Sequence, residues 1–240
     1  MAAVADVPLN VVILGPPGAG KGTQAERFAR DHGIPKVSTG DILREAVTAG
    51  TALGRQVKAL MDRGDLVSDD LIIGIVEERL ARSDARSGFV LDGFPRTVEQ
   101  ARALDELLAK RGPVVVVEVQ VPDEELVRRV RSRRICSKCG RLVSAFGSDG
   151  AAERCSYCGG ELVARSDDAE SVVRDRLKVY WRATRPMIAF YSQRPTYRAV
   201  DGAQAPERVR EAVVEAVAAA IGRPVAGLKH GQAAQPESKA

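Results

Sequence analysis

The chain has 240 residues, of which 45% are hydrophobic and only 4% aromatic. This length suits one large domain, or one core with small insertions, and the core must be mainly aliphatic. The net charge of +4 fits a protein that handles phosphate, although so small an excess is a weak indication by itself.

The amino-terminal segment lacks the features of an export signal. Its apolar run, residues 11–14, is too short, and no Lys or Arg precedes it. The sequence contains no transmembrane pattern. We therefore expect a cytoplasmic protein whose four cysteines are reduced, which favours metal binding over disulfides.

Apolar strand-like runs alternate along the chain with helical patterns, which predicts a parallel sheet with crossover helices. Strands are expected at 9–14, 34–37, 88–92, 114–121 and 196–200. Helices are expected at 21–31, 39–49, 51–63, 69–82, 97–111, 123–134, 168–193 and 206–221. The run 113–121 is β-branched and almost wholly apolar, as a buried parallel strand should be.

Two stretches interrupt this alternation. Residues 38–68 are helical without a strand, and residues 135–166 contain all four cysteines, several glycines and short β-like pieces. We interpret both as small subdomains mounted on the core. The last stretch, 223–240, is rich in Ala, Gly, Gln and Pro and is expected to be disordered.

A glycine-rich stretch, GPPGAGKGT at residues 15–23, follows the first strand and opens a helix, as a Walker A loop does. Backbone N–H groups at a helix amino terminus point at anions, and glycines allow the backbone to approach closely. Lys21 would hold the β- and γ-phosphates. Gly22 stands where Ser or Thr usually ligates magnesium, and Thr23 follows one residue later. An ordinary glycine-rich turn is the alternative, but the position after an apolar strand argues against it.

A second expected strand ends in the sequence DGFPRT, residues 92–97. Asp92 lies at its carboxyl end, where ligands bind in open α/β sheets, and a carboxylate there can hold magnesium directly or through water. Arg96 follows in a tight turn and can bind a phosphate through two N–H groups. One turn further on, the amide of Gln100 can read a base edge. From these residues alone, a Gly-Pro turn with a surface arginine stays open.

Residues 128–141 contain seven cations and no acid. The cations are Arg128, Arg129, Arg131, Arg133, Arg134, Lys138 and Arg141. Because a solvated helix face normally mixes charges of both signs, this segment indicates an anionic ligand. About half of these cations, and of the later Arg165, Arg174 and Arg176, are expected to be solvated, and some to pair with nearby acids.

The four cysteines form two pairs, Cys136-x-x-Cys139 and Cys155-x-x-Cys158, separated by fifteen residues. Glycines follow the second cysteine of each pair, as in zinc knuckles, and this spacing is a strong indication of zinc. Four thiolates complete a tetrahedron and leave no open position. The predicted site is therefore structural.

Together these motifs resemble the adenylate kinase family in its long-lid, zinc-containing form. The resemblance runs from about Val11 to Gln204 and rests on GPPGAGKGT, STGDILR, DRGDLVSDDLI, GFVLDGFPRT, RRIC-x2-C, RSDD and VVRDRL. It implies an α/β, P-loop NTPase-like, three-layer fold with a five-stranded parallel sheet. The core would comprise residues 1–37, 69–129 and 168–222, with a helical AMP-binding insertion at 38–68 and a small β-rich zinc lid at 130–167.

The resemblance also implies individual roles. ATP would contact Gly18, Ala19, Gly20, Lys21, Gly22, Thr23, Arg129, Arg133, Leu142, Val143 and Gln204. AMP would contact Thr39, Arg44, Asp65, Leu66, Val67, Gly93, Phe94, Pro95, Arg96, Gln100, Arg165 and Arg176. Catalysis would use Lys21, Arg96, Arg133, Arg165 and Arg176, with Asp92 holding the magnesium hydration shell. Asp167 and Asp168 would latch the lid.

The implied activity is reversible, magnesium-dependent phosphoryl transfer from ATP to AMP, which gives two ADP and maintains adenine nucleotide balance. The implied cofactors are Mg²⁺ with ATP and a structural Zn²⁺. The implied partners are ATP, AMP and ADP. We expect a monomer that binds neither nucleic acid nor a membrane.

Two alternatives compete with this interpretation. The first is another nucleoside monophosphate kinase, one acting on UMP and CMP or using GTP as donor. The long cysteine-bearing lid argues against the pyrimidine enzymes, and Thr39 and Gln100 favour AMP. The second is a zinc-ribbon ATPase that binds nucleic acid, because a basic segment adjoins the cysteines. Against it, no second acid follows Asp92, and only Phe146 and Tyr157 offer base-stacking rings in the zinc module.

Overall fold

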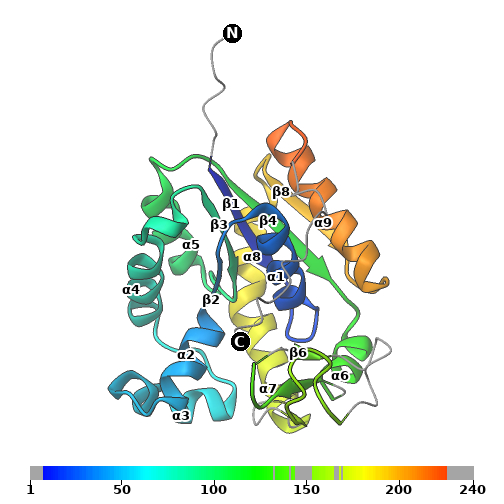
Figure 1. Ribbon diagram of the computed structural model, residues 1–240. Helices are drawn as coiled ribbons and strands as arrows, with labels where there is room; N and C mark the ends of the chain where they lie inside the picture. Colours follow the sequence, from blue (N-terminus) through cyan, green and yellow to red (C-terminus); the bar gives the residue numbers. More distant parts are fainter. Residues whose placement is uncertain are drawn as a thin grey trace, which may run out of the picture.

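The core of the protein is a five-stranded parallel sheet flanked by helices (Figure 1). The computed structural model describes residues 8–131, 133–140, 142–143, 153–164, 168 and 170–225. The strand order is β2-β3-β1-β4-β8, and all four pairings are parallel, as the alternation of strands and helices predicted. The strands are β1 (Leu9–Leu14), β2 (Lys36–Ser38), β3 (Gly88–Asp92), β4 (Val114–Gln120) and β8 (Tyr197–Asp201).

Alternate residues of the central strands build two hydrophobic cores, one on each face of the sheet. In β1, Val12 and Leu14 belong to the first core, and Val11 and Ile13 to the second. The first core is closed by α2 (Thr39–Thr48), α3 (Ala52–Arg63), α4 (Asp69–Leu80), α5 (Val98–Leu108) and α8 (Arg185–Ser192). The second is closed by α1 (Lys21–His32), α6 (Asp123–Arg131), α7 (Glu170–Val179) and α9 (Pro206–Ile221). These two faces give the three-layer arrangement.

One charged side chain lies within the buried strand β4. Glu118 is only 2% exposed. Its carboxylate accepts hydrogen bonds from the Tyr197 hydroxyl and, at 2.9 Å, from the Gln120 amide, and Arg185 lies 3.6 Å away. Burial and the neighbouring carboxylate raise the pKa of Tyr197. The Glu118 carboxylate can be buried in this apolar strand because it has partners on β4, β8 and α8.

Three expected helices differ from those observed by three residues or more. The helix expected at 97–111 ends at Leu108. The helix expected at 123–134 ends at Arg131, because the chain turns there into β5 (Arg134–Cys136). The helix expected at 168–193 is divided by a π turn, η3 (Tyr180–Thr184), between α7 and α8. Pro186 has no N–H to donate to the carbonyl of residue 182, and its ring crowds that carbonyl, so the helix widens there.

A small antiparallel sheet forms beside the core. Its order is β6-β5-β7, with β6 at Leu142–Val143 and β7 at Leu162–Val163. In Figure 1, β6 lies beside α6 and α7 at the lower right, and α2 and α3 lie at the lower left. Both parts that the sequence marked as interruptions therefore lie at one end of the core.

After α9 the chain still contacts the core at Val225. Val225 packs against the second hydrophobic core, and the remainder of the stretch expected to be disordered, 226–240, lies outside the described residues. A short 3₁₀ turn, η1 (Ser83–Ala85), precedes β3. Within the described part of the chain, no helix combines the length and the apolar character needed to cross a bilayer.

Replacement by alanine should have opposite effects on the free energy of unfolding at two helical glycines, Gly54 and Gly74. A methyl group at Gly54 in α3 would collide with the backbone carbonyl of Ala46 in α2, whereas a methyl group at Gly74 in α4 meets open space. Gly54→Ala should lower the free energy of unfolding by about 1–3 kcal/mol through overpacking. Gly74→Ala should raise it by about 0.5–1 kcal/mol, because alanine favours helix.

Urea unfolding of both variants measures this difference. Equal effects of the two substitutions would contradict the close packing of α2 on α3.

Candidate active site

One cavity of about 420 Å³, here called the main cavity, lies among the start of α1, the start of α2, the end of β3, α6 and the loop before α9. Its volume is within the range of small-ligand sites. Eight cationic side chains line it, against three carboxylates. The cations are Lys21, Lys36, Arg44, Arg96, Arg128, Arg129, Arg133 and Arg176, and the carboxylates are Asp41, Asp92 and Glu125. This balance fits a ligand with several negative charges.

The glycine-rich loop connects β1 to α1 and lies against α6. Gly18 has a φ of +88°, and a Cβ there would lie 2.8 Å from Val130 Cγ2 and 2.9 Å from the carbonyl oxygen of Leu126. Only glycine allows both this conformation and this close approach. Residues 17–23 of the loop line the main cavity, so the loop lies where the motif would place it to face an anion.

The unusual Gly22 has a structural explanation. A Cβ at this position would lie 3.1 Å from Asp92 Oδ2. A Ser or Thr side chain, as in most Walker A loops, would therefore crowd the carboxylate. Glycine at position 22 therefore leaves room for the Asp92 carboxylate beside the loop.

Lys21 is surrounded by like charges. Its Nζ donates a hydrogen bond of 2.8 Å to the carbonyl oxygen of Pro16. Burial, together with the charges of Arg96, Arg176 and Arg133, lowers the pKa of Lys21 to about 8, while Asp92 acts in the opposite direction. A phosphate group would remove this penalty by supplying the missing counter-charge.

The turn after β3 holds Arg96 against the cavity. Arg96 Nε donates to the carbonyl oxygen of Gly93 at 2.8 Å, and the Thr39 hydroxyl donates to the same oxygen at 3.0 Å. Burial lowers the pKa of Arg96, and Asp92 opposes this effect. The peptide bond between Phe94 and Pro95 is cis. The hydrogen bond to the Gly93 carbonyl orients the guanidinium in the absence of a ligand.

A second group of charges comes from β2 and α2. Asp41 pairs with Arg44 and, at 3.1 Å, with Lys36. Burial acts to raise the pKa of Asp41, but the two cations lower it to about 2. Arg44 was expected at the site, whereas Lys36 and Asp41 were not. The motif STGDILR contains Asp41, so its charge was the available signal.

The basic segment that follows the start of α6 pairs with acids from outside it. Glu125 accepts from Arg128 and, at 2.8 Å, from Arg129 Nε. Arg129 also donates to the carbonyl oxygens of Gly202, at 2.8 Å, and Ala203, at 3.3 Å. These two arginines are therefore among the cations that were expected to pair with a nearby acid. The sequence signal was Glu125 itself, one helical turn upstream.

Arg133 has a partner that is distant in sequence. Its Nε donates to Asp168 Oδ2 at 2.7 Å, a second guanidinium nitrogen donates to Oδ1, and the Asp168 side chain is only 3% exposed. This ion pair joins the end of α6 to the segment before α7. Arg133 nevertheless lines the main cavity.

The other expected residues are distributed over several environments. Gln204 lines the main cavity, and Arg176 lines both it and a smaller cavity of about 70 Å³, which Leu66, Gly93 and Pro95 also line. Asp65 pairs with Arg63 at 2.9 Å, and Val67 and Phe94 are buried in the first core. Thr39 and Gln100 are buried and line neither cavity. Leu142 and Val143 lie in β6, with side chains outside the description, and Arg165 and Asp167 lie outside the described residues.

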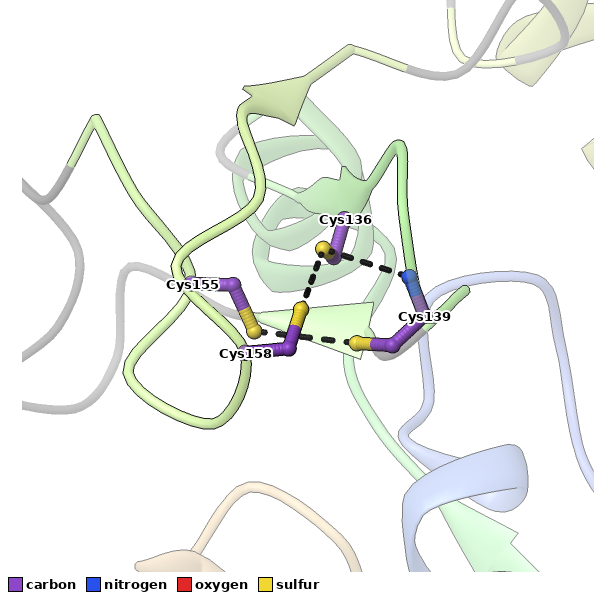
Figure 2. Close-up of side chains that lie close together, drawn as sticks. All are labelled: Cys136, Cys139, Cys155 and Cys158. Atoms are coloured by element: carbon purple, nitrogen blue, oxygen red, sulfur yellow. Dashed lines mark hydrogen bonds between the residues drawn. The ribbon is translucent and has the colours of Figure 1, made fainter.

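The four cysteines converge on one point. In Figure 2 their side chains point toward one another, and all four sulfur atoms lie within 4.8 Å. The Sγ atoms of Cys136 and Cys158 are 3.4 Å apart, and those of Cys139 and Cys155 are 3.7 Å apart. A tetrahedral zinc with bonds of about 2.3 Å needs sulfur separations of about 3.8 Å. The cluster therefore has the dimensions of a four-thiolate metal site.

Backbone N–H groups lower the pKa of two of these thiols. The N–H of Cys139, helped by that of Lys138, lowers the pKa of Cys136 to about 6. The N–H groups of Tyr157 and Cys158 lower the pKa of Cys155. Because metal binding requires thiolates, this arrangement favours occupation by a cation.

The electrostatics of Lys21 predict a stability that depends on pH. The folded-state pKa of about 8 is below the ordinary value of 10.5, so charged Lys21 opposes folding. That cost is complete below about pH 8 and disappears as the pH rises through 10.5. Lys21→Met should therefore raise the melting temperature of the ligand-free protein at pH 7, and the difference from wild type should shrink at higher pH.

Calorimetry across this pH range, with Lys21→Arg as the control that keeps the charge, measures the effect. A lower melting temperature for Lys21→Met at pH 7 would contradict it.

Known proteins with the same sequence pattern identify the family. A family model described as adenylate kinase matches residues 13–196. An adenylate kinase of Archaeoglobus fulgidus is 47% identical over 215 residues, which cover 87% of this chain and 99% of the relative. An adenylate kinase of Methanothrix thermoacetophila is 48% identical over 198 residues, 81% of this chain and 92% of the relative. The chain, whose glycine-rich loop lines a cavity rich in arginine, belongs to the adenylate kinase family.

Proposed function

We propose that the protein transfers the terminal phosphoryl group of ATP to AMP, reversibly and with magnesium, to give two ADP and so maintain the balance of adenine nucleotides. One observation carries this proposal beyond family membership. The main cavity is continuous from the glycine-rich loop to Arg44 and Arg96, so the two groups that we propose to bind phosphate face one space. A phosphotransferase needs such a space because donor and acceptor must lie in line.

The donor would bind at the glycine-rich loop. Its phosphates would lie along residues 18–23, with Lys21 on the β- and γ-phosphates and Arg133 beside them. The nucleoside would lie toward Arg129 and Gln204, which line the same cavity next to the loop before α9. The β6 residues Leu142 and Val143 would complete this contact, as the family resemblance implies.

The acceptor would bind on the opposite side. Its phosphate would meet Arg44, Arg96 and Arg176, and Arg165 would join them. Its base would lie near the residues that the resemblance assigns to AMP, which are Thr39, Asp65, Leu66, Val67, Gly93, Phe94, Pro95 and Gln100. Leu66 and Pro95 support this placement because they line the smaller cavity beside Arg96 and Arg176.

No side chain need act as a general base in this reaction. Phosphoryl transfer has a loose transition state, so positioning and charge stabilisation supply most of the catalysis. Asp92 would hold the hydration shell of magnesium, and bound magnesium would offset part of the charge on the phosphates. Lys21, Arg96, Arg133, Arg165 and Arg176 would stabilise the negative charge that the transferring group carries.

Water is the competing acceptor, and we propose that two parts of the chain exclude it. Residues 38–68 would close over AMP, and residues 130–167 would close over ATP as a lid latched by Asp167 and Asp168. The core would comprise 1–37, 69–129 and 168–222. Closure would remove water that otherwise attacks ATP. As the resemblance implies, the protein would act as a cytoplasmic monomer that binds neither nucleic acid nor a membrane.

A coupled assay for ADP tests the activity. ATP plus AMP should give ADP only with magnesium, and AMP should be used better than UMP, CMP or GMP. Lys21→Met should lower turnover by about a hundredfold or more, a loss of roughly 3 kcal/mol of transition-state stabilisation. Lys178→Met, which removes an exposed cation of α7 outside the cavity, should leave turnover unchanged.

ADP formation that needs no magnesium, or a preferred acceptor other than AMP, would overturn the proposal.

We also propose that the four cysteines bind one structural zinc. All four ligand positions are thiolates, so none is open for water or phosphate. Gly160 supports the site because a Cβ there would lie 2.7 Å from Cys136 Sγ, so only glycine leaves room for the thiolate. The small sheet β6-β5-β7 has two- and three-residue strands, too short to hold its shape by hydrogen bonds alone.

Removal of one ligand should therefore affect stability rather than chemistry. Cys155→Ser should lower the melting temperature and increase hydrogen exchange in β5 and β7, because metal binding and folding are coupled. Enzyme that remains folded at low temperature should still require magnesium and keep much of its activity. Ser156→Ala, in the same knuckle, is the matched control. Wild type with less than about half an equivalent of thiophilic metal would refute the site.

A further inference from the structure

Asp69 links the start of α4 to the turn that carries Arg96. It is the first residue of α4 and directly follows the segment 38–68. Its Oδ2 accepts a hydrogen bond of 2.8 Å from the Thr97 hydroxyl, and its Oδ1 accepts one of 2.7 Å from Gln100 Nε2. Gln100 Oε1 in turn accepts a bond of 2.7 Å from the backbone N–H of Arg96. Gln100 itself is only 2% exposed.

These contacts leave Gln100 one amide orientation. An ionised carboxylate only accepts hydrogen bonds, so the NH₂ group must face Asp69. A backbone N–H only donates, so the carbonyl oxygen must face Arg96. A rotated amide would place an oxygen against the Asp69 carboxylate and an NH₂ group against the N–H of Arg96. Both contacts would be repulsive in a buried site, where unpaired polar groups are costly.

Capping of α5 does not explain this arrangement. Thr97 already caps that helix by accepting from Gln100 N–H. Asp69 could satisfy Thr97 with one oxygen and leave the other to water. Instead the second oxygen binds the buried amide. The carboxylate therefore determines which end of the Gln100 amide faces which neighbour.

The fixed amide has one lone pair and one N–H still to use. Together they match a base edge that presents a donor beside an acceptor, such as the 6-amino group and ring nitrogen of adenine. Hypoxanthine has the same shape, but it presents an acceptor at position 6 and an N–H at position 1. It would need the opposite amide orientation, which Asp69 and Arg96 both oppose.

We infer that Asp69 is a positioning residue that makes the acceptor site selective for 6-aminopurines by fixing the amide of Gln100. The inference rests on the proposed function, in which Gln100 meets the base of AMP. Asp69 contacts no substrate in this account. Asp69 acts through its hydrogen bond to Gln100 Nε2. Its effect is a difference in affinity between adenine and hypoxanthine, which have the same size.

The test compares AMP with IMP as acceptors, using ATP as donor. Asp69→Asn keeps the shape but can donate as well as accept, so it removes the part of the penalty on the rotated amide that the Asp69 carboxylate imposes and leaves the part imposed by the Arg96 N–H. The ratio of kcat/KM for AMP to that for IMP should fall by about tenfold, the size expected when one charge-assisted hydrogen bond no longer discriminates. The KM for ATP should not change.

Thr97→Val is the matched control. It removes the other partner of Asp69 and the cap of α5, and it leaves the bond between Asp69 and Gln100. It should lower the melting temperature without changing the AMP to IMP ratio. Should Asp69→Asn fail to fold, Asp69→Ser offers the same test with a smaller side chain. An unchanged ratio in the Asp69 variant, or an equal fall in the Thr97 variant, overturns the inference.

Gln100→Leu separates this inference from the proposal beneath it. If Gln100 reads the base, this variant should lose most of the preference for AMP, and adding Asp69→Asn should change the ratio no further. If Gln100→Leu keeps the wild-type ratio, the assignment of Gln100 to the base fails, and the inference about Asp69 fails with it. Phosphoryl transfer to AMP by wild type is the separate readout for the function itself.

Discussion

Repulsion among the cations around the main cavity is the constraint on which the site depends. Eight positive side chains face one space that contains three carboxylates. Burial, together with the charges of Arg96, Arg176 and Arg133, lowers the pKa of Lys21 to about 8. Such a cavity is poorly stable when empty and well matched to two nucleotides, whose phosphates supply the absent negative charge. The repulsion lowers the stability of the empty state, but the same positive charges are needed when the transferring group becomes most negative.

Two carboxylates of the cavity, and Asp168 outside its lining, limit the repulsion by pairing with particular cations. Asp41 holds Lys36 and Arg44, Glu125 holds Arg128 and Arg129, and Asp168 holds Arg133. Lys21 and Arg96 instead rely on backbone carbonyls, with Asp92 nearby. Lys21 and Arg96 are expected to act on the transferring phosphate, and neither has to break an ion pair with a carboxylate before it can do so. Preorganisation of this kind avoids a rearrangement at the moment of reaction.

Local sequence was enough to predict the individual strands, the position of the glycine-rich loop and the two cysteine pairs, because each of these depends on residues close together in the chain. Four of the five strands begin within one residue of their predicted positions, and the cysteine pairs converge as their spacing indicated. The pairing of Arg133 with Asp168 was not predictable in this way, since it joins residues 35 positions apart. The π turn at Tyr180–Thr184 was missed because helical periodicity continues across it, and only Pro186 signals the interruption. The roles of Asp69 and Lys36 likewise depend on how separate elements approach.

The ion pair between Arg133 and Asp168 is a contact between distant segments that also affects how the site can bind phosphate. Asp168 is almost wholly buried, so releasing Arg133 to a phosphate would leave a buried carboxylate without its cation. An uncompensated buried charge costs about 3–5 kcal/mol, which is more than the roughly 1.5–3 kcal/mol gained from one charge-assisted hydrogen bond to phosphate. Nucleotide binding is therefore favourable at Arg133 only if the guanidinium keeps Asp168 on one edge while it meets phosphate with another, or if Asp168 acquires a new donor. A planar guanidinium has five N–H groups, of which this ion pair uses two, so the first solution is available without any movement of Asp168. The buried acid would then orient the arginine toward the phosphate rather than compete with it.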